Sequence, residues 1–157
     1  MSSSTKGKTE ERLAQLGLVL PPIPSPMANY VPYVQSGSLV FLSGQGPRRP
    51  EGGMHIGKVG DDVTVEEAYL HARLVGLQLL AALSAASAGL DSVVRIVKVF
   101  GMVNCGPDFG RHPQVINGCS DLFVEVLGDR GRHARSAVGM GSLPDGITVE
   151  IEAIAEV

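Results

Sequence analysis

Apolar residues recur at helical spacing in two long segments of the chain. In the first segment, Thr64 stands three residues before Glu67. That spacing is typical of a capping box, in which each of the two side chains bonds a backbone N–H at the start of a helix. The apolar positions that follow are Ala68, Ala72, Val75, Leu79 and Ala82. The pattern predicts a helix that begins after Thr64 and ends before Gly89, a residue suited to a left-handed helix stop.

The second periodic segment begins at Pro113, which suits the first turn of a helix because it has no N–H to leave unpaired. Gly128 follows the last apolar position of this segment. Its apolar stripe consists of Val115, Ile116, Cys119, Leu122, Phe123 and Val126. The spacing predicts a second helix that ends at Gly128 and buries this stripe.

Four other segments are typical of strands. Leu39–Ser43 is a short apolar run, Val93–Val103 is mostly β-branched, and Ala134–Met140 is rich in small and apolar residues. Along Gly146–Val157, one set of alternate positions is Ile147, Val149, Ile151, Ala153, Ala155 and Val157, and the other is Thr148, Glu150, Glu152, Ile154 and Glu156. Alternation with period two places these sets on opposite faces of a strand. The order of elements predicts an α+β fold with one mixed sheet and both helices on one face.

The N-terminal part of the chain differs in composition from the rest. Residues 1–8 are small, polar and basic, and we predict that they are disordered. Thr9–Leu16 predicts a short helix, and the proline-rich run 21–26 excludes both a helix and a central strand. We therefore expect residues 1–29 to form an arm laid across a single domain of residues 30–157.

A long glycine-rich loop, residues 46–62, separates the first predicted strand from the first long helix. Within it, Gly52–Lys58 has the outline of a phosphate-binding loop, but Val59 stands where that motif needs Ser or Thr. No strong strand precedes the segment either. We interpret it as a flexible loop that does not bind nucleotide, and at this length such a loop is either mobile or functional.

The composition limits the classes of protein to which the chain can belong. Of its 157 residues, 44% are hydrophobic, and the formal net charge is −3. No uninterrupted apolar run approaches the ~18 residues that a membrane span needs. The N-terminus also lacks the apolar core of a secretory signal. We therefore expect a soluble, cytoplasmic protein without a membrane partner, and the negative charge disfavours a nucleic-acid partner.

Few residues form a recognisable metal or nucleophile motif. Cys105 and Cys119 are too few for a disulfide framework, and we interpret them as buried free thiols. The four histidines have no ligand spacing with one another or with the cysteines, so no metal is expected. Ser43 lacks the Gly-x-Ser-x-Gly context of a hydrolase nucleophile. It is either a turn serine at the end of a strand or a hydroxyl presented at the edge of a site.

Two charged residues stand on predicted strands. Arg135 lies just inside a strand of small and apolar residues, where it must either extend to solvent or bind an anion. Its planar guanidinium can bind a carboxylate through two parallel hydrogen bonds. Glu150 belongs to the polar set of the last strand, for which a solvated sheet face is the default. Taken alone, the residues leave both alternatives open in each case.

Four short segments occur in a characteristic order along the chain. They are Tyr30–Gln35, Val40–Gln45, Ala134–Ser136 with Leu143-Pro144, and Val149–Ala155. Together with two helices in the intervening gaps, these segments resemble the Rid family, whose members are also called YjgF-like proteins or L-PSP endoribonucleases. The resemblance covers residues 30–157. It implies a chorismate-mutase-like α+β sandwich and a homotrimer, with the sheets packed into a central barrel and clefts between subunits.

The resemblance also implies a chemistry, which is the hydrolysis of 2-imino or enamine acids to 2-oxo acids and ammonia without a cofactor. Arg135 matches the arginine that binds the substrate carboxylate, and Glu150 matches the acidic residue that holds the attacking water. The other residues that match the substrate-binding positions are Tyr33, Ser43, Gly44, Asn117 and Ala137. A small carboxylate is therefore the implied ligand.

The chain departs from the compact family members in its longer arm and loop and at His133, where they usually have proline. His133 is either a loop histidine or a proton donor that reaches the cleft. Two other functions are alternatives: RNA cleavage or translation inhibition, as the older family name implies, and non-catalytic binding of small carboxylates by a trimer. The negative charge and the presence of only three tyrosines and four phenylalanines give RNA binding weak support.

Overall fold

Five strands form one mixed sheet in the computed structural model, which describes residues 7–25 and 28–157. The strands are β1 (Tyr33–Ser36), β2 (Leu39–Gln45), β3 (Arg95–Asn104), β4 (Ala134–Met140) and β5 (Val149–Glu156). Their order across the sheet is β1-β2-β5-β3-β4. All neighbouring pairs are antiparallel except β3 and β4, which are parallel because α3 connects them.

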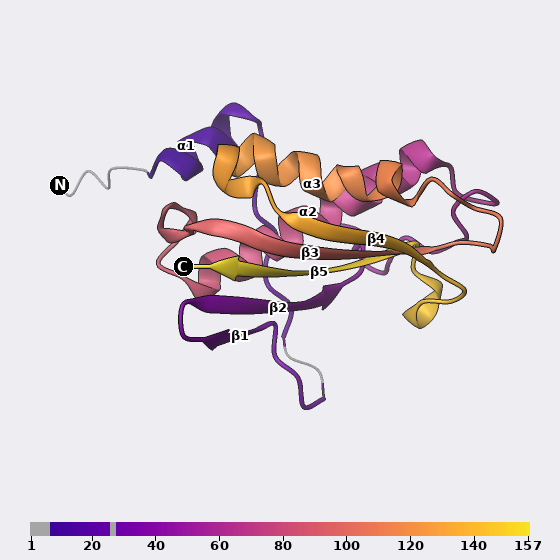
Figure 1. Ribbon diagram of the computed structural model, residues 1–157, viewed down its shortest axis with the longest axis horizontal. Coiled ribbons are helices and arrows are strands. Elements are labelled where there is room, and N and C mark those ends of the chain that lie inside the picture. Colours follow the sequence, from indigo (N-terminus) through magenta and orange to yellow (C-terminus); the bar gives the residue numbers. More distant parts are fainter. Residues whose placement is uncertain (1–6, 26–27) are drawn as a thin grey trace.

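Two long helices cover one face of this sheet. These are α2 (Val65–Ala86) and α3 (His112–Leu127). A short third helix, α1 (Lys8–Gln15), belongs to the N-terminal arm. In Figure 1, α2 runs behind the strands and packs against β2 and β5. The helix α3 lies beside α2 and packs against β3 and β4. The α+β architecture predicted from the sequence, with both long helices on one face, is therefore confirmed.

The start of α2 has the predicted capping box. The Thr64 backbone N–H donates to Glu67 Oε2 over 2.8 Å, and the Glu67 N–H donates to Thr64 Oγ1 over 3.1 Å. By length and composition alone α2 could cross a membrane, but more than half of its most apolar stretch is buried inside the protein. It is thus placed as a core helix of this domain, packed against both the sheet and α3.

The structure corrects several predicted boundaries. Tyr33–Ser36 is a strand that the apolar pattern did not predict, because it is a short edge strand with only its first residue half-buried. The last strand begins at Val149, because a short 3₁₀ turn, Pro144–Gly146, precedes it. Thr148 was expected on the polar face, but it is fully buried and hydrogen-bonded to His71.

The loop 46–62 is not structureless. Isolated β-bridges pair Arg48 with Met54, Ile56 with Ile147, and Val59 with Cys105. The Arg48 backbone N–H also donates to Gln78 Oε1 of α2 over 3.1 Å. These contacts fasten the loop both to the long helix and to the end of the sheet, which corrects the prediction of an irregular, flexible segment.

The N-terminal arm is attached to the domain through α1. Residues 1–6 of the segment predicted to be disordered lie outside the described residues, whereas Lys8 already begins the helix. Thr9 donates its backbone N–H to Asp91 over 2.9 Å and accepts a hydrogen bond from Arg130 over 3.2 Å. Residues 17–25 then continue without a helix or strand, as the prolines predict.

A pair of histidines joins the loop to α2. The rings of His55 and His71 are stacked with their centroids 4.1 Å apart, and His71 Nδ1 lies 3.0 Å from the hydroxyl of the buried Thr148. Burial, reinforced by the neighbouring His55, lowers the pKa of His71 from 6.5 to about 4. Both imidazole rings are therefore neutral when they stack in the folded protein.

The protein is expected to lose stability as the pH falls from about 6.5 to about 4. In this range the unfolded chain holds a proton on His71 that the folded protein does not, so the free energy of unfolding decreases as the pH decreases. Urea denaturation on the two sides of this range measures the effect. His71→Gln should reduce the pH dependence, and an unchanged dependence in this variant would contradict the assignment.

Candidate active site

Arg135 projects from β4 toward α3. In the parallel pairing of β3 and β4 it lies opposite the buried Val99. Its guanidinium donates to Ser120 Oγ over 3.0 Å and to the Pro113 carbonyl over 3.4 Å. Among the described residues no carboxylate forms a salt bridge with Arg135. The guanidinium is half-buried and is oriented by neutral groups. Its positive charge is therefore available to bind an anionic ligand.

Behind this arginine lies a short chain of hydrogen bonds. His133 Nδ1 is 2.6 Å from the Gly131 carbonyl, which can only accept, so this nitrogen carries the proton. His133 Nε2 then accepts from the Ser120 hydroxyl over 2.9 Å, which leaves the Ser120 oxygen to accept from Arg135. Burial is the main cause that lowers the pKa of His133 and favours the neutral ring. Sequence reasoning did not single out Ser120, because no motif marks a helical serine.

Asn117 and Ala137 lie beside Arg135. On α3, Asn117 stands one turn after Pro113 and about one turn before Ser120, so all three share one side of the helix. Asn117 is half-buried. Ala137 follows Arg135 by two residues on β4, faces the same side, and packs against the edge of the core. The structure thus brings together three of the predicted site residues at the β4 edge.

Next to this group, an open pocket of about 630 Å³ lies at the end of β4. It is lined by Lys58, Cys105, Gly106, Pro107, Phe109, His112, Gly139, Met140 and Gly141. Cys105 Sγ lies 3.5 Å from His112 Nε2, and Phe109 packs edge-on against the same imidazole. Both cysteines are buried free thiols, as predicted, and burial raises the pKa of Cys105.

Glu150 and Gly44 form a second group on adjacent strands. A Cβ at Gly44 would lie 3.3 Å from Glu150 Cδ, so any larger residue at this position would require the Glu150 side chain to shift. Glu150 is half-buried. Its burial and then the like charge of Glu152 raise its pKa above the usual range.

The two groups lie on opposite faces of the sheet. A Cβ on Gly101 would collide with Ile116 of α3, so Gly101 faces the helices. Its partners across the sheet, Ala137 and Ile151, therefore face the helices too. Arg135 shares the side of Ala137, whereas Glu150 alternates with Ile151 and faces away. One chain by itself does not bring Arg135 and Glu150 together.

Two further predicted site residues point elsewhere. Tyr33 Oη donates to the Ala85 carbonyl at the end of α2 over 3.5 Å. Ser43 donates its hydroxyl to the Val31 carbonyl over 2.6 Å, and its N–H to the Pro32 carbonyl over 2.9 Å. The Ser43 hydroxyl is therefore engaged in fixing the segment before β1, as in the turn-serine interpretation.

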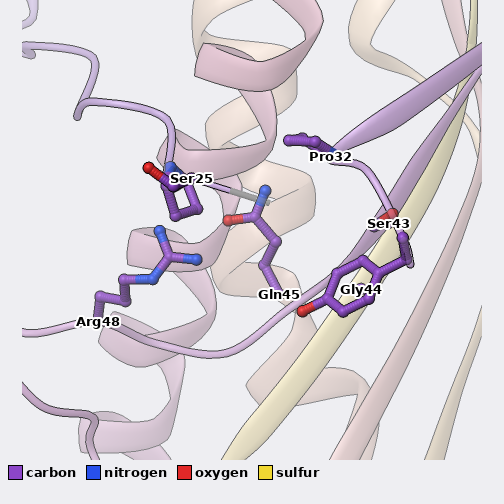
Figure 2. Close-up of a pocket in the computed structure, with 8 residues that line it drawn as sticks. Ser25, Pro32, Ser43, Gly44, Gln45 and Arg48 are labelled. Atoms are coloured by element: carbon purple, nitrogen blue, oxygen red, sulfur yellow. The ribbon is translucent and has the colours of Figure 1, made fainter. Parts of the chain in front are cut away.

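A small pocket of about 60 Å³ opens at the end of β2, next to Gly44. It is lined by Pro24, Ser25, Tyr30, Pro32, Ser43, Gly44, Gln45 and Arg48. Figure 2 shows the Arg48 guanidinium and the Gln45 carboxamide directed into the space beside Ser25. Across residues 7–25 and 28–157, no three His, Cys, Asp or Glu side chains are grouped as metal ligands.

Comparison with known proteins places the chain among relatives of similar length. Residues 10–154 match the sequence model of the family described as "YjgF/chorismate mutase-like, putative endoribonuclease". Protein TCP17 of Trypanosoma cruzi is 42% identical over 157 residues, which cover 99% of this chain and 98% of that protein.

Solved structures agree with this match. Atu1372 of Agrobacterium tumefaciens, a protein of unknown function, shares 44% identity with a TM-score of 0.85, over 95% of this chain and 91% of that one. TdcF of E. coli, solved with bound serine, shares 27% identity with a TM-score of 0.60, over 86% of this chain and 93% of that one. The expected chorismate-mutase-like fold is therefore confirmed.

Proposed function

The chain belongs to the YjgF/chorismate mutase-like family, and from that premise we propose that it hydrolyses 2-imino or enamine acids to 2-oxo acids and ammonia. The observation that carries the proposal is the orientation of Arg135 by Ser120, His133 and the Pro113 carbonyl. A guanidinium held by neutral groups at a sheet edge retains its charge for a substrate carboxylate. The serine bound to TdcF, a small amino acid with a carboxylate, supports a ligand of this class.

A site that uses both Arg135 and Glu150 needs more than one copy of the chain, because the two residues lie on opposite faces of the sheet. None of the helices in the described part of the chain covers the face that bears Glu150. Phe41, 43% exposed, lines a hollow there together with Phe100 and Ile154. We infer a homotrimer in which these faces pack into a central barrel and Arg135 of one copy approaches Glu150 of another.

Light scattering after gel filtration tests the assembly. A trimer of 16.4 kDa chains has a mass of about 49 kDa, which is three times the chain mass. Phe41→Glu should produce monomers, because it replaces an apolar side chain with a charge that the barrel would bury next to Glu152. Val19→Glu changes a residue that is 84% exposed on the N-terminal arm and serves as the control. A monomeric wild-type protein would contradict the shared site.

In the proposed reaction, water adds to the imine carbon, and the electron pair of the C=N π bond moves to nitrogen. Glu150, as a carboxylate, accepts a hydrogen bond from the attacking water, takes up its proton and then passes this proton to the nitrogen of the adduct. The C–N bond breaks as ammonia leaves, and the hydroxyl of the adduct gives its proton to the departing ammonia as the carbonyl of the 2-oxo acid forms. Arg135 fixes the substrate carboxylate, and the backbone at Ala137 contacts the imine nitrogen. A protonated imine is already electrophilic, so positioning and electrostatics supply most of the rate gain.

The test of this function is the rate of imine loss in solution. An amino-acid oxidase generates the 2-imino acid in situ, and semicarbazide trapping reports the imine that remains. The wild-type protein should accelerate its conversion to the 2-oxo acid. If the protein does not accelerate the hydrolysis of 2-imino acids with several different side chains, the proposal is overturned and non-catalytic binding of carboxylates remains. Salt-sensitive cleavage of RNA would instead support the endoribonuclease named in the family description.

Glu150→Gln should lower kcat by about 10²-fold, because the amide positions water but cannot accept its proton. Glu152→Gln is the matched control, since Glu152 lies on the same strand and face but is exposed. In the wild type, kcat should fall as the pH decreases through the raised pKa of Glu150, because only the carboxylate is active. Glu152→Gln should shift this acid limb to lower pH by removing a like charge. A wild-type activity in Glu150→Gln would contradict the role.

A further inference from the structure

The open pocket at the end of β4 lies on the same face of the sheet as Arg135. Arg135 and Gly139 are four residues apart on β4, so both face the helices. A Cβ at Gly139 would lie 2.5 Å from His112 Nε2 and 2.8 Å from Cys105 Sγ, and both of these side chains line the pocket. The residue after His112 is Pro113, whose carbonyl accepts a hydrogen bond from Arg135. The pocket therefore adjoins the place where Arg135 presents its charge.

The size and the lining of this pocket suit a large apolar group. Its volume is about 630 Å³, far more than a methyl side chain would fill. Phe109 and Pro107 line it from the loop before α3, and the ring of Phe109 packs edge-on against His112 with centroids 5.1 Å apart. Such an aromatic pair can accept a third ring in a similar edge-on or offset arrangement.

The charges around the pocket favour an aromatic ring over a carboxylate. Lys58 is the charged residue that lines the pocket, and its ammonium group donates to the Gly141 carbonyl. A cation beside an apolar pocket attracts the negative face of an aromatic ring. Asp61 and Asp108 line the adjoining hollow, which shares Phe109 with this pocket. These two carboxylates disfavour a second anion nearby.

We propose that this pocket binds the side chain of the substrate, so that aromatic 2-imino acids, such as the imine of phenylalanine, are preferred to those with small side chains. This inference rests on the proposed function, in which Arg135 binds the carboxylate next to the imine. With the imine nitrogen at the backbone of Ala137, the side chain extends along β4 past Gly139. Phe109 is then the residue that determines specificity.

Binding of two oxo acids tests the pocket without any reaction. Pyruvate and 3-phenylpyruvate differ only in the phenyl group. Calorimetry should show that the wild-type protein binds 3-phenylpyruvate about 10-fold more tightly, as expected for an apolar group that enters a partly open pocket. Phe109→Leu should reduce this preference and leave the affinity for pyruvate unchanged. Equal affinities of the wild-type protein for the two oxo acids would overturn the inference.

Gly141→Leu tests the pocket by filling it. A Cβ at Gly141 would have no atom within 4 Å, and its φ is not positive, so leucine is accommodated there and occupies part of the pocket. It should weaken the binding of 3-phenylpyruvate about 10-fold and leave that of pyruvate unchanged. Gly110→Leu is the matched control, because Gly110 has the same freedom but does not line the pocket. Unchanged binding of 3-phenylpyruvate by Gly141→Leu, or equal weakening of both oxo acids, would overturn the inference.

Lys58→Met tests the role of the charge. 3-Cyclohexylpyruvate has a ring of similar size without π electrons, so the wild-type protein should bind it less tightly than 3-phenylpyruvate. The substitution should remove this difference, because methionine keeps an apolar side chain without the ammonium group. Tighter binding of 2-oxoglutarate than of 3-phenylpyruvate by the wild-type protein would show that Lys58 binds a second carboxylate, and would overturn the inference.

Deamination assays separate this inference from the proposed function. The imine generated from phenylalanine should be hydrolysed with a kcat/KM about 10-fold higher than that from alanine, after the spontaneous rates are subtracted. Hydrolysis of both with equal kcat/KM would sustain the proposed function and overturn the aromatic preference. Preferential binding of 3-phenylpyruvate that Gly141→Leu abolishes, without hydrolysis of either imine, would sustain the pocket and overturn the proposed function.

Discussion

Arg135→Gln should reduce kcat/KM for 2-imino acid hydrolysis by about 10²- to 10³-fold, the effect of removing one partner of a buried, hydrogen-bonded charge pair. Glutamine cannot form two parallel charge-assisted bonds with a carboxylate. Arg135→Lys keeps the charge but not the fork, so it should recover only part of the loss. Assays with in situ imine, together with affinity for a 2-oxo acid, measure the effect on both the reaction and carboxylate binding.

Arg132→Gln provides the control for charge. Arg132 lies three residues before Arg135 but is 73% exposed in its side chain, and it pairs at 3.3 Å only with the nearly fully exposed Asp129. Such a surface pair contributes little to stability. This variant should keep its activity. If Arg132→Gln and Arg135→Gln lost activity equally, or if Arg135→Gln kept it, Arg135 would not be the residue that binds the carboxylate.

Gly118→Ala should destabilise the fold by about 3 kcal/mol or more, at the upper end of overpacking effects. Gly118 lies where α3 crosses α2, and a Cβ there would be 1.9 Å from the Tyr69 carbonyl oxygen and 3.0 Å from the Arg73 backbone nitrogen. Both obstacles are backbone atoms of α2, so no side-chain rotation can relieve the contact. Urea denaturation measures the loss, and a failure to obtain folded protein is the extreme form of the same result.

Gly110→Ala is the matched control for this substitution. Gly110 has no atom within 4 Å of a Cβ position and does not have a positive φ. Its replacement should leave the free energy of unfolding nearly unchanged or raise it slightly, because alanine restricts the unfolded chain. Comparable stability of Gly118→Ala and Gly110→Ala would mean that the two helices can move apart at little cost.

The helices and strands that the sequence predicts correctly are those formed by interactions between residues close together in the sequence. The capping box of Thr64 and Glu67 involves residues within one helical turn, and the sequence predicted it correctly. The alternation along Val149–Glu156 is equally local, and every second residue of that strand is buried as predicted. β1 was missed because it is an edge strand whose last three residues are exposed, so its composition carries no periodic signal.

The candidate site was predicted only in part, because its geometry depends on distant residues. Resemblance to the family marked Arg135 and Asn117, which the structure places close together. It did not mark Ser120, and it left His133 as either a loop residue or a cleft residue. Their hydrogen-bonded chain joins the middle of α3 to the start of β4, and nothing in the spacing of those residues required it.

By itself, the sequence determined the helices, most of the strands and the family, because periodicity and short motifs depend only on residues that are close together in the sequence. Only the tertiary structure decided which groups meet. The parallel pairing of β3 with β4 and the antiparallel pairing of β3 with β5 set the face on which each side chain lies. They place Arg135 beneath α3 and Glu150 on the opposite face, because a shift of one residue in either register would exchange the faces. Register is fixed by the packing of the whole core, so the separation of these two residues could not be read from their positions in the sequence.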